Sequence, residues 1–230
     1  MPIYQLPRDP RFPDPRRADA SGLLAVGGDL SAERLLTAYQ MGIFPWFGPG
    51  QPILWWSPDP RMILDVADLR VNRSLRKRIR QEPFRVTLDT AFHDVIVACA
   101  SVPRPGQDGT WITDGMVAAY DQLHALGFAH SVEAWDAEGT LVGGLYGVAS
   151  GRMFFGESMF AKAPDASKIA FVRLVQQLDA WGFPMIDCQM YTDHLARFGA
   201  HEISRAEFLS RCAHLVGQQH RPGPWRFDSP

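Results

Sequence analysis

The stretch LVGGLYGVASGRMFF, residues 141–155, decides the fold of this chain. Two apolar runs flank Ala149-Ser150-Gly151, and this pattern predicts a β-hairpin that turns at those three residues. Further along, apolar residues of 166–181 recur at helical spacing, and Gly182 follows as a natural helix end. The apolar stretch 185–188 then predicts a short buried strand. A hairpin, a helix and another strand in this order indicate a sheet covered by helices.

Outward from this region, the spacing of apolar residues and caps predicts further elements. Helices are expected at 31–41, 72–81, 89–100 and 116–126 and after the capping-box pattern of Ser204 and Glu207, and a strand is expected at 130–135. Proline and glycine argue against a regular element in 42–52. The order of the elements indicates an α+β or mixed α/β fold, with a small N-terminal domain at 1–62 and a larger domain at 63–230.

Composition indicates an ordinary globular protein. The 230 residues are 46% hydrophobic and 21% charged, with a net charge of −2, so no global basic field attracts nucleic acid. The three cysteines lack CxxC spacing, which fits a reducing compartment. The sequence contains neither a membrane-length apolar run nor an apolar signal core near its start, so a cytoplasmic location is expected. No large amphipathic stripe is left over, which favours a monomer.

A basic run extends from Arg70 to Arg80 without any acidic residue. On a helix its cations share one face, because they follow the spacing i, i+3, i+4, i+7: Arg73, Arg76, Lys77 and Arg80. Like charges on one face repel one another, so the stripe predicts a footprint for a phosphate backbone. The alternative is a solvated surface helix.

Aromatic side chains gather where proline and glycine are frequent: Trp46, Phe47, Trp55, Trp56 and Trp111. Tryptophan in such surroundings either fills an interface or stacks on a planar ligand such as a nucleic-acid base. Since Trp55 and Trp56 are adjacent, one of them can face inward while the other faces a cleft.

Two segments place polar side chains among bulky apolar ones. Glu157 lies in FGESMF, where burial raises the pKa of a carboxyl group unless a cation or hydrogen-bond donors hold its charge. The functional interpretation is that Glu157 binds a cation or an amine. The alternative is a structural hydrogen bond to nearby backbone amides. Strand alternation puts Asp187 and Gln189 on one face. A neutral amide both donates and accepts hydrogen bonds but accepts protons poorly, so Gln189 suits orientation better than general-base catalysis.

Other chemistries find less support. Cys188 has no adjacent histidine and faces away from Gln189 by alternation, so a small core residue is a better reading than a thiol nucleophile. The seven histidines are scattered, and no metal site is expected. Neither GxxxxGK[ST] nor GxGxxG occurs, which leaves nucleotide hydrolysis and dinucleotide binding without a motif.

Taken together, eight motifs between Gly22 and Phe208 resemble the leucyl/phenylalanyl-tRNA–protein transferase family. In chain order they are GLLAVGGDLSAERLLTAYQMGIFPWF (22–47), PILWWSPDPR (52–61), TWIT (110–113), AHSVEAW (129–135), LVGGLYGV (141–148), FFGESMF (154–160), ASK (166–168) and IDCQ (186–189). The motifs are long and rare in combination, and the likeness runs from about Gly22 to Phe208, which is most of the chain.

The resemblance implies an enzyme that takes leucine or phenylalanine, and methionine less readily, from its charged tRNA. The residue is transferred to the N-terminal Arg or Lys of an acceptor protein, which then enters N-end rule degradation. The implied fold class is α+β, with a larger domain that resembles GCN5-related N-acetyltransferases and has a mixed sheet flanked by helices. No coenzyme A is used, since the aminoacyl-tRNA is the donor.

The resemblance also implies roles for individual residues. Trp46 and Trp111 would contact the terminal adenosine of the tRNA, with Tyr120 nearby. The aminoacyl side chain would enter an apolar pocket formed by Leu145, Phe154, Phe171, Leu174, Leu178 and Ile186. The basic stripe matches the family's tRNA-binding surface. Either Glu157 or Asp187 would supply the negative charge that selects Arg or Lys.

We consider two hypotheses for the mechanism of this transfer. In one, Gln189, oriented by Asp187, places the amine and steadies the developing oxyanion. In the other, Asp187 accepts the proton through Gln189. The chain departs from the family at Thr192, where an Asn is favoured, so a contact of that amide is expected to change.

Two alternative functions are compatible with parts of this sequence. A coenzyme A-dependent N-acetyltransferase of the same fold would bind acetyl-coenzyme A, but the phosphate loop is missing. A non-catalytic RNA-binding module would bind RNA even without Glu157, Asp187 and Gln189. Acceptor proteins and the preference between Leu and Phe lie beyond the sequence.

Overall fold

The predicted hairpin lies at the centre of the larger sheet. In the computed structural model, which describes residues 3–102 and 110–228, β8 (Leu141–Ser150) pairs antiparallel with β9 (Met153–Ala161). Strand β10 (Met185–Gln189) continues the sheet parallel to β9. The strand order is β11-β5-β10-β9-β8-β7-β6, with β11 at His201–Ile203, β5 at Arg61–Asp65, β7 at Ala129–Trp135 and β6 at Arg85–Leu88.

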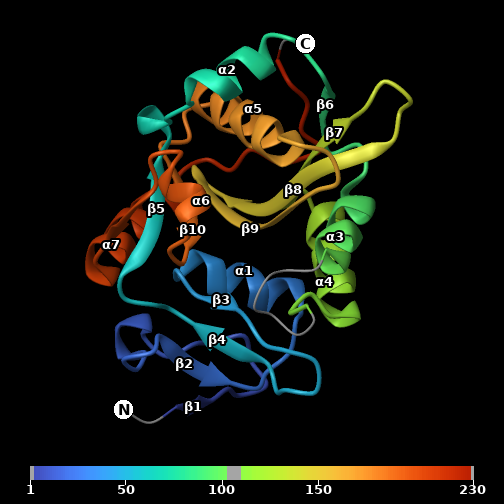
Figure 1. Cartoon of the computed structure of the whole chain (residues 1–230). Helices are drawn as coiled ribbons and strands as arrows, with labels where there is room; N and C mark the ends of the chain where they lie inside the picture. The colour runs from blue at the N-terminus through green and yellow to red at the C-terminus, as the bar shows by residue number, and fades with distance from the viewer. Residues whose placement is uncertain (1–2, 103–109, 229–230) are drawn as a thin grey trace.

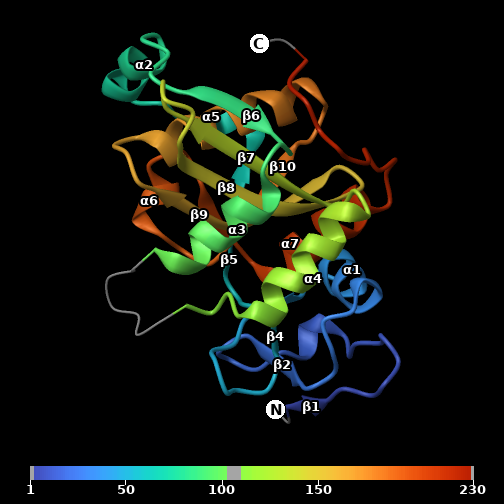
Figure 2. The same cartoon turned by 90° about the vertical axis from the view of Figure 1, so that its right-hand side faces the viewer.

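Side-chain alternation along the hairpin decides which helices cover each face of this sheet. Leu145 and Phe154 belong to the apolar cluster of α5 (Ala166–Ala180), whereas Tyr146 and Phe155 belong to that of α3 and α4. Figures 1 and 2 show α5 on one side of the sheet and α3, α4 and α1 on the other. The helices are α1 (Ala32–Gln40), α2 (Arg73–Ile79), α3 (Phe92–Ser101), α4 (Asp114–Ala125), α6 (Asp193–Ala196) and α7 (Arg205–Val216).

Three of the predicted helix starts are confirmed by their caps. Ser31, Asn72 and Ser204 each accept a hydrogen bond from the backbone N–H three residues ahead. The helix predicted from Asp89 begins only at Phe92, so that expectation was wrong by three residues. The reason is that Asp89 takes positive φ and accepts hydrogen bonds from the next strand, at His130 and Ser131.

A second, smaller sheet comes from the N-terminal part of the chain. Its order is β1-β2-β4-β3, with β1 at Tyr4–Gln5, β2 at Leu23–Val26, β4 at Leu54–Trp56 and β3 at Phe44–Pro45. Strand β3 corrects the expectation that 42–52 lacks a regular element. Proline is tolerated there because β3 lies at the sheet edge.

The expected α+β architecture, with a small N-terminal sheet and a larger mixed sheet flanked by helices, is confirmed. One apolar cluster extends from Leu24 of the small sheet to Phe155 of the large one, so the two share a core. The division into domains near residue 62 stays a prediction. Within the described residues, the helices are too short or too polar to cross a membrane.

Candidate active site

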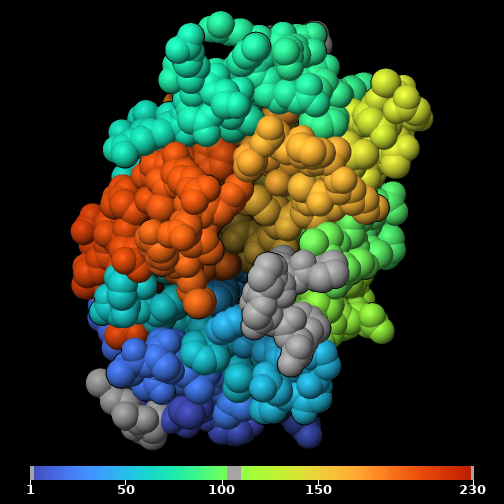
Figure 3. Space-filling model, viewed as in Figure 1, coloured from blue at the N-terminus to red at the C-terminus, as the bar shows by residue number. Residues whose placement is uncertain are grey.

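A cavity of about 380 Å³ opens where the small sheet meets β8, β9 and β10. Figure 3 shows the surface hollowed between the orange segment that carries α6 and the gold segment of β9 and α5. The lining is mostly apolar and aromatic, with a polar group at Glu157 and Gln189. Such a cavity is typical of a site that binds an apolar group and orients it with a few polar contacts.

Most of the predicted site residues line this cavity. They are Trp46, Trp111, Leu145, Phe154, Phe171, Ile186, Glu157, Asp187 and Gln189. Leu145, Phe154 and Ile186 come from β8, β9 and β10, which are neighbours in the sheet, and Phe171 comes from α5, which packs on β8 and β9. Gly147 allows the ring of Phe154 to reach its place, since a Cβ atom there would lie 2.5 Å from that ring.

Leu174 and Leu178 do not belong to the lining; both are fully buried in the core under α5. They share a helix face with Phe171, but each helical turn carries a residue about 5.4 Å further along the axis. Only the N-terminal part of α5 therefore reaches the cavity. The pocket implied by the family resemblance is corrected at these two positions.

Glu157 lies in β9 next to a register shift in its pairing with β8. Its carboxylate accepts hydrogen bonds from Tyr39 (2.8 Å), Tyr120 (3.1 Å) and the side-chain amide of Gln189 (3.0 Å). Burial outweighs these donors and raises the pKa of Glu157 to about 7. The carboxyl group therefore changes its charge near neutral pH.

Tyr120 supports Glu157 rather than lining the cavity. The hydroxyls of Tyr39 and Tyr120 also hydrogen-bond each other, which closes a ring of three contacts with the carboxyl group. The three hydrogen bonds need three donated protons, and the two phenol hydroxyls supply only two of them. The third proton is present when the carboxyl group of Glu157 is protonated. An approaching cation would favour the ionised form instead.

Asp187 is fully buried and forms an ion pair with Arg61 of β5. The guanidinium donates from Nε to Oδ1 (2.8 Å) and from Nη2 to Oδ2 (2.6 Å). The rings of Phe44 and Phe208 lie 4.8 and 4.4 Å from the guanidinium carbon. Because both carboxylate oxygens are engaged, Asp187 is held as one half of a neutral pair.

Gln189 ends β10 at a bulge, with a φ of 63°. Its backbone N–H donates to Oδ1 of Asp187 (2.9 Å), while its side-chain amide nitrogen donates to Glu157. Within the described parts of the chain, the amide oxygen has no hydrogen-bond partner, so it can accept from an incoming amine. Asp187 thus orients Gln189 through the backbone, and the two side chains do not contact each other.

Two neighbouring positions bear on the predicted chemistry. Burial raises the pKa of the Cys188 thiol far above its usual range, which leaves it protonated and a poor nucleophile. Thr192 caps α6 by accepting a hydrogen bond from the N–H of Leu195 (3.2 Å). Asn and Thr are both favoured N-caps, so the departure from the family pattern keeps the cap.

The aromatic residues divide between core and cavity. Trp55 is fully buried and donates to the carbonyl of Gly27 (2.9 Å). Trp56 does not line the cavity, but its indole donates to the carbonyl of Trp46 (2.7 Å) and packs edge-on against that ring. Trp46 and Trp111 are the two indoles that reach the cavity wall.

The basic stripe lies on α2, at the top of the molecule in Figure 1. Arg73, Arg76, Lys77 and Arg80 line one shallow groove together, as their spacing predicts. None of the four forms an ion pair with any residue that the structure describes. The groove is therefore free to bind an anion.

Arg61 and Tyr39 were missed as site residues from the sequence. Arg61 closes the motif PILWWSPDPR, and a buried carboxylate such as Asp187 calls for a cation, but periodicity does not say which cation. Tyr39 was assigned to the apolar face of its helix, and its hydroxyl contacts were not foreseeable. Among the residues described, no three His, Cys, Asp or Glu side chains gather as a metal site would.

Comparisons with known proteins show the family of the chain. The sequence model of "Leucyl/phenylalanyl-tRNA protein transferase" matches residues 63–213, and that of its N-terminal domain matches residues 28–59. A leucyl/phenylalanyl-tRNA--protein transferase of Anaeromyxobacter dehalogenans is 59% identical over 100% of this chain and 98% of that protein. One of Thiobacillus denitrificans is 61% identical over 92% of each.

Among solved structures, that of L-PGS from Bacillus licheniformis covers 75% of this chain and 57% of that chain. It is 14% identical, with a TM-score of 0.41, which is too low for the likeness to bear on function. The sequence matches span nearly the whole chain at high identity. The chain belongs to the leucyl/phenylalanyl-tRNA–protein transferase family, a family of aminoacyltransferases.

Proposed function

We propose that this protein transfers leucine or phenylalanine, and methionine less readily, from aminoacyl-tRNA to the α-amino group of an N-terminal Arg or Lys. The product enters N-end rule degradation. The observation that carries the proposal is an apolar cavity that ends at Glu157 and Gln189, with two indoles on its wall. The proposal includes a monomeric, cytoplasmic enzyme that uses neither coenzyme A nor a metal.

The apolar part of the cavity suits the side chain of the donor residue. Leu145, Phe154, Phe171 and Ile186 line it without any charged group among them. A pocket of this kind separates similar apolar side chains by only about 1–3 kcal/mol per methylene, which fits a broad preference for Leu, Phe and Met. Polar side chains are disfavoured because they would lose their hydration.

The tRNA would be held by stacking and by charge. Trp46 and Trp111 offer flat apolar faces on which the terminal adenosine would stack. Stacking of a base on an aromatic ring does not depend on the nucleotide sequence. The unpaired cations of α2 offer contacts to the phosphate backbone.

The cationic acceptor residue needs a negative partner, and two carboxylates lie within reach. Asp187 is neutralised by Arg61, whereas Glu157 has no cation partner in the part of the chain that the structure describes. This difference favours Glu157 as the group that receives the side chain of Arg or Lys. Binding of that cation would stabilise the ionised carboxylate.

The chemical step needs a neutral amine held close to an activated ester. The amine nitrogen forms a bond to the carbonyl carbon, the bond to the ribose 3′-oxygen breaks, and the proton from the amine ends on that oxygen through water or the tRNA. The side-chain oxygen of Gln189 accepts a hydrogen bond from the amine and fixes its direction. The ion pair of Asp187 with Arg61 favours this positioning role over proton transfer through Gln189 to Asp187.

The test is a transfer assay with tRNA charged with labelled leucine and a peptide that begins with Arg. RNase treatment of the donor and N-acetylation of the peptide serve as controls. If label moves to the peptide in the assay but in neither control, the result supports aminoacyl-tRNA as the donor, the N-terminal amine as the acceptor and the formation of a peptide bond between them. Charged tRNA that binds without transfer would instead favour an RNA-binding module.

A further inference from the structure

A small cavity of about 160 Å³ lies between the basic groove of α2 and the active site. It shares Ser74 with the groove and His194 with the active-site cavity. The small cavity therefore adjoins both the groove of α2 and the place where the aminoacyl ester is proposed to react.

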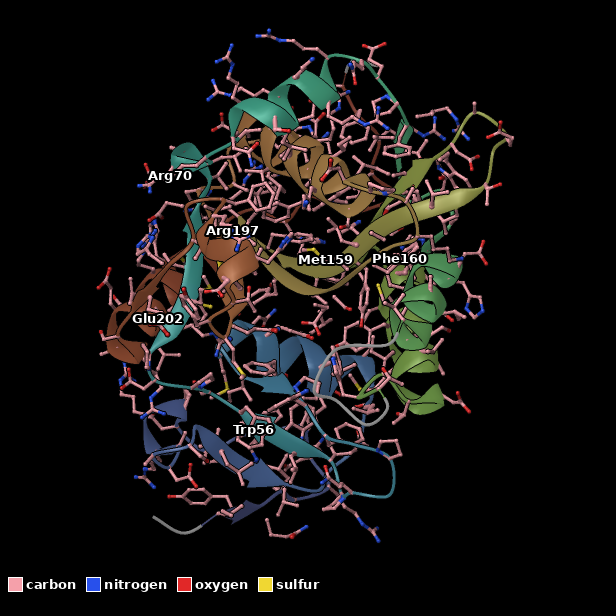
Figure 4. The ribbon with its side chains drawn as sticks, viewed as in Figure 1. Trp56, Arg70, Met159, Phe160, Arg197 and Glu202 are labelled. Carbon is pink, nitrogen blue, oxygen red and sulfur yellow. The ribbon has the colours of Figure 1, made fainter. Side chains whose placement is uncertain are left out.

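The walls of the small cavity are rich in cations. Arg70, Lys168 and Arg197 line it, together with Asp165. Asp165 is paired with Lys168 at 2.7 Å, but neither Arg70 nor Arg197 has a side-chain partner in the described ranges. Figure 4 shows Arg70 and Arg197 on the same flank of the molecule, below α2. Arg70 and Arg197 are exposed residues that line the same hollow, so both would attract an anion bound in it.

His194 supplies a hydrogen-bonding group where the small cavity meets the active site. Its Nε2 atom is shielded from solvent and has no hydrogen-bond partner in the described part of the chain. Burial and the nearby charges of Lys168 and Arg197 lower the pKa of this imidazole, so the ring stays neutral at pH 7. A shielded polar atom without a partner is unfavourable, and an oxygen ligand would satisfy it.

We infer that the cavity formed by Arg70, Lys168, Arg197 and His194 is a phosphate subsite for the single-stranded 3′ end of the aminoacyl-tRNA. This inference rests on the proposed function. The proposed acceptor carries a cationic N-terminal residue, which these arginines would repel, so the polyanionic donor is the substrate that fits. The subsite connects the phosphate contacts of α2 with the ester in the active site.

The test compares three phenylalanyl donors with the double variant Arg70→Gln/Arg197→Gln. The donors are phenylalanyl-tRNA, a phenylalanyl CCA trinucleotide and 3′-O-phenylalanyladenosine, which has no phosphate. We expect the variant to raise KM about tenfold for the tRNA, to raise it for the trinucleotide, and to leave kcat unchanged. The salt dependence of tRNA binding should become shallower by about 1.4 in log–log slope, about 0.7 for each lost single-strand contact. With the phosphate-free donor, we expect variant and wild type to have the same KM.

Two further variants control for charge and folding. Arg8→Gln/Arg16→Gln removes the same charge from the N-terminal segment, which Figure 1 draws at the opposite end of the molecule from α2, and should leave KM unchanged. Arg70→Lys/Arg197→Lys keeps the charge and should therefore keep the wild-type salt dependence of tRNA binding.

The inference is overturned if the Gln pair leaves KM and salt slope for tRNA unchanged. It is also overturned if the loss is equal with the phosphate-free donor, or if the Lys pair has the same shallow salt slope as the Gln pair. The proposed function fails in a different way, since wild type would then transfer phenylalanine from none of the three donors.

Discussion

Arg61 and Asp187 form a fully buried, two-pronged ion pair between neighbouring strands, although 126 residues separate them in the sequence. The same carboxylate accepts the backbone N–H of Gln189 at the bulge that ends β10. The pair thus fixes the backbone from which Gln189 projects, and Asp187 acts as a positioning residue.

Asp187→Asn should destabilise the protein by about 3–5 kcal/mol, because it leaves the Arg61 charge buried without its partner. Denaturant unfolding measures this change. The exposed Asp193→Asn is a control and should change stability by less than about 0.5 kcal/mol. Arg61→Met/Asp187→Leu should recover stability but not transfer activity. If Asp187→Asn were as stable as the wild type, the result would contradict the stabilising role of the ion pair with Arg61.

Gln189→Glu should reduce the transfer rate by about 10- to 100-fold, the effect of losing one hydrogen bond to a charged group. The new carboxylate would lie where the amide now donates to Glu157 at 3.0 Å, so the two would repel each other. Single-turnover transfer from phenylalanyl-tRNA to an Arg peptide measures the rate. Retained activity would argue against the positioning role and in favour of proton transfer through this side chain.

Glu157 should give transfer a pH dependence with a midpoint near 7. Its pKa is raised to about 7 by burial, so the negative charge that attracts Arg or Lys forms only as the pH rises through this value. We expect kcat/KM for an Arg peptide to increase with pH across this range, and this increase to be absent in Glu157→Gln. If both proteins showed the same increase, it would come instead from the α-amine of the peptide, which titrates at about 8.

The same pKa links Glu157 to folding stability. The folded state holds the proton up to about pH 7, whereas the unfolded state releases it near 4.5, so the folded state binds more protons between these values. The contribution to stability is complete below pH 4.5 and is lost as the pH rises to about 7. The free energy of unfolding should be measured for wild type and Glu157→Gln at several pH values. The wild type should lose stability relative to the variant as the pH rises over this range, and the difference between them should be constant above it.

Leu145→Ala should shift the donor preference toward phenylalanine by about tenfold in the ratio of kcat/KM values, because it enlarges the apolar end of the cavity. Leu174→Ala is the matched control, since Leu174 is equally buried but lies outside the lining. Both should cost about 2–5 kcal/mol of stability. Competition between leucyl- and phenylalanyl-tRNA measures the ratio, and an equal shift in both variants would show that the pocket is not where the side chain binds.

Much of the secondary structure followed from the sequence because it depends on local spacing. The hairpin at 141–155, α5 and the caps at Ser31, Asn72 and Ser204 each reflect a pattern within a few residues. The basic groove was predictable for the same reason: four cations at helical spacing share a face whatever surrounds them. Apolar surroundings and strand alternation pointed to Glu157, Asp187 and Gln189 for the same reason, and the family resemblance added the roles predicted for them.

The tertiary structure alone decided how these groups meet. It paired Asp187 with Arg61, turned the amide of Gln189 toward Glu157, and closed the ring of Tyr39 and Tyr120 around that carboxyl group. It also kept Leu174 and Leu178 out of the cavity. Periodicity tells which side of an element is buried, but the identity of a partner depends on the packing of segments distant in sequence. A buried charge must find its counterpart wherever the fold brings one, and that is a property of the whole chain.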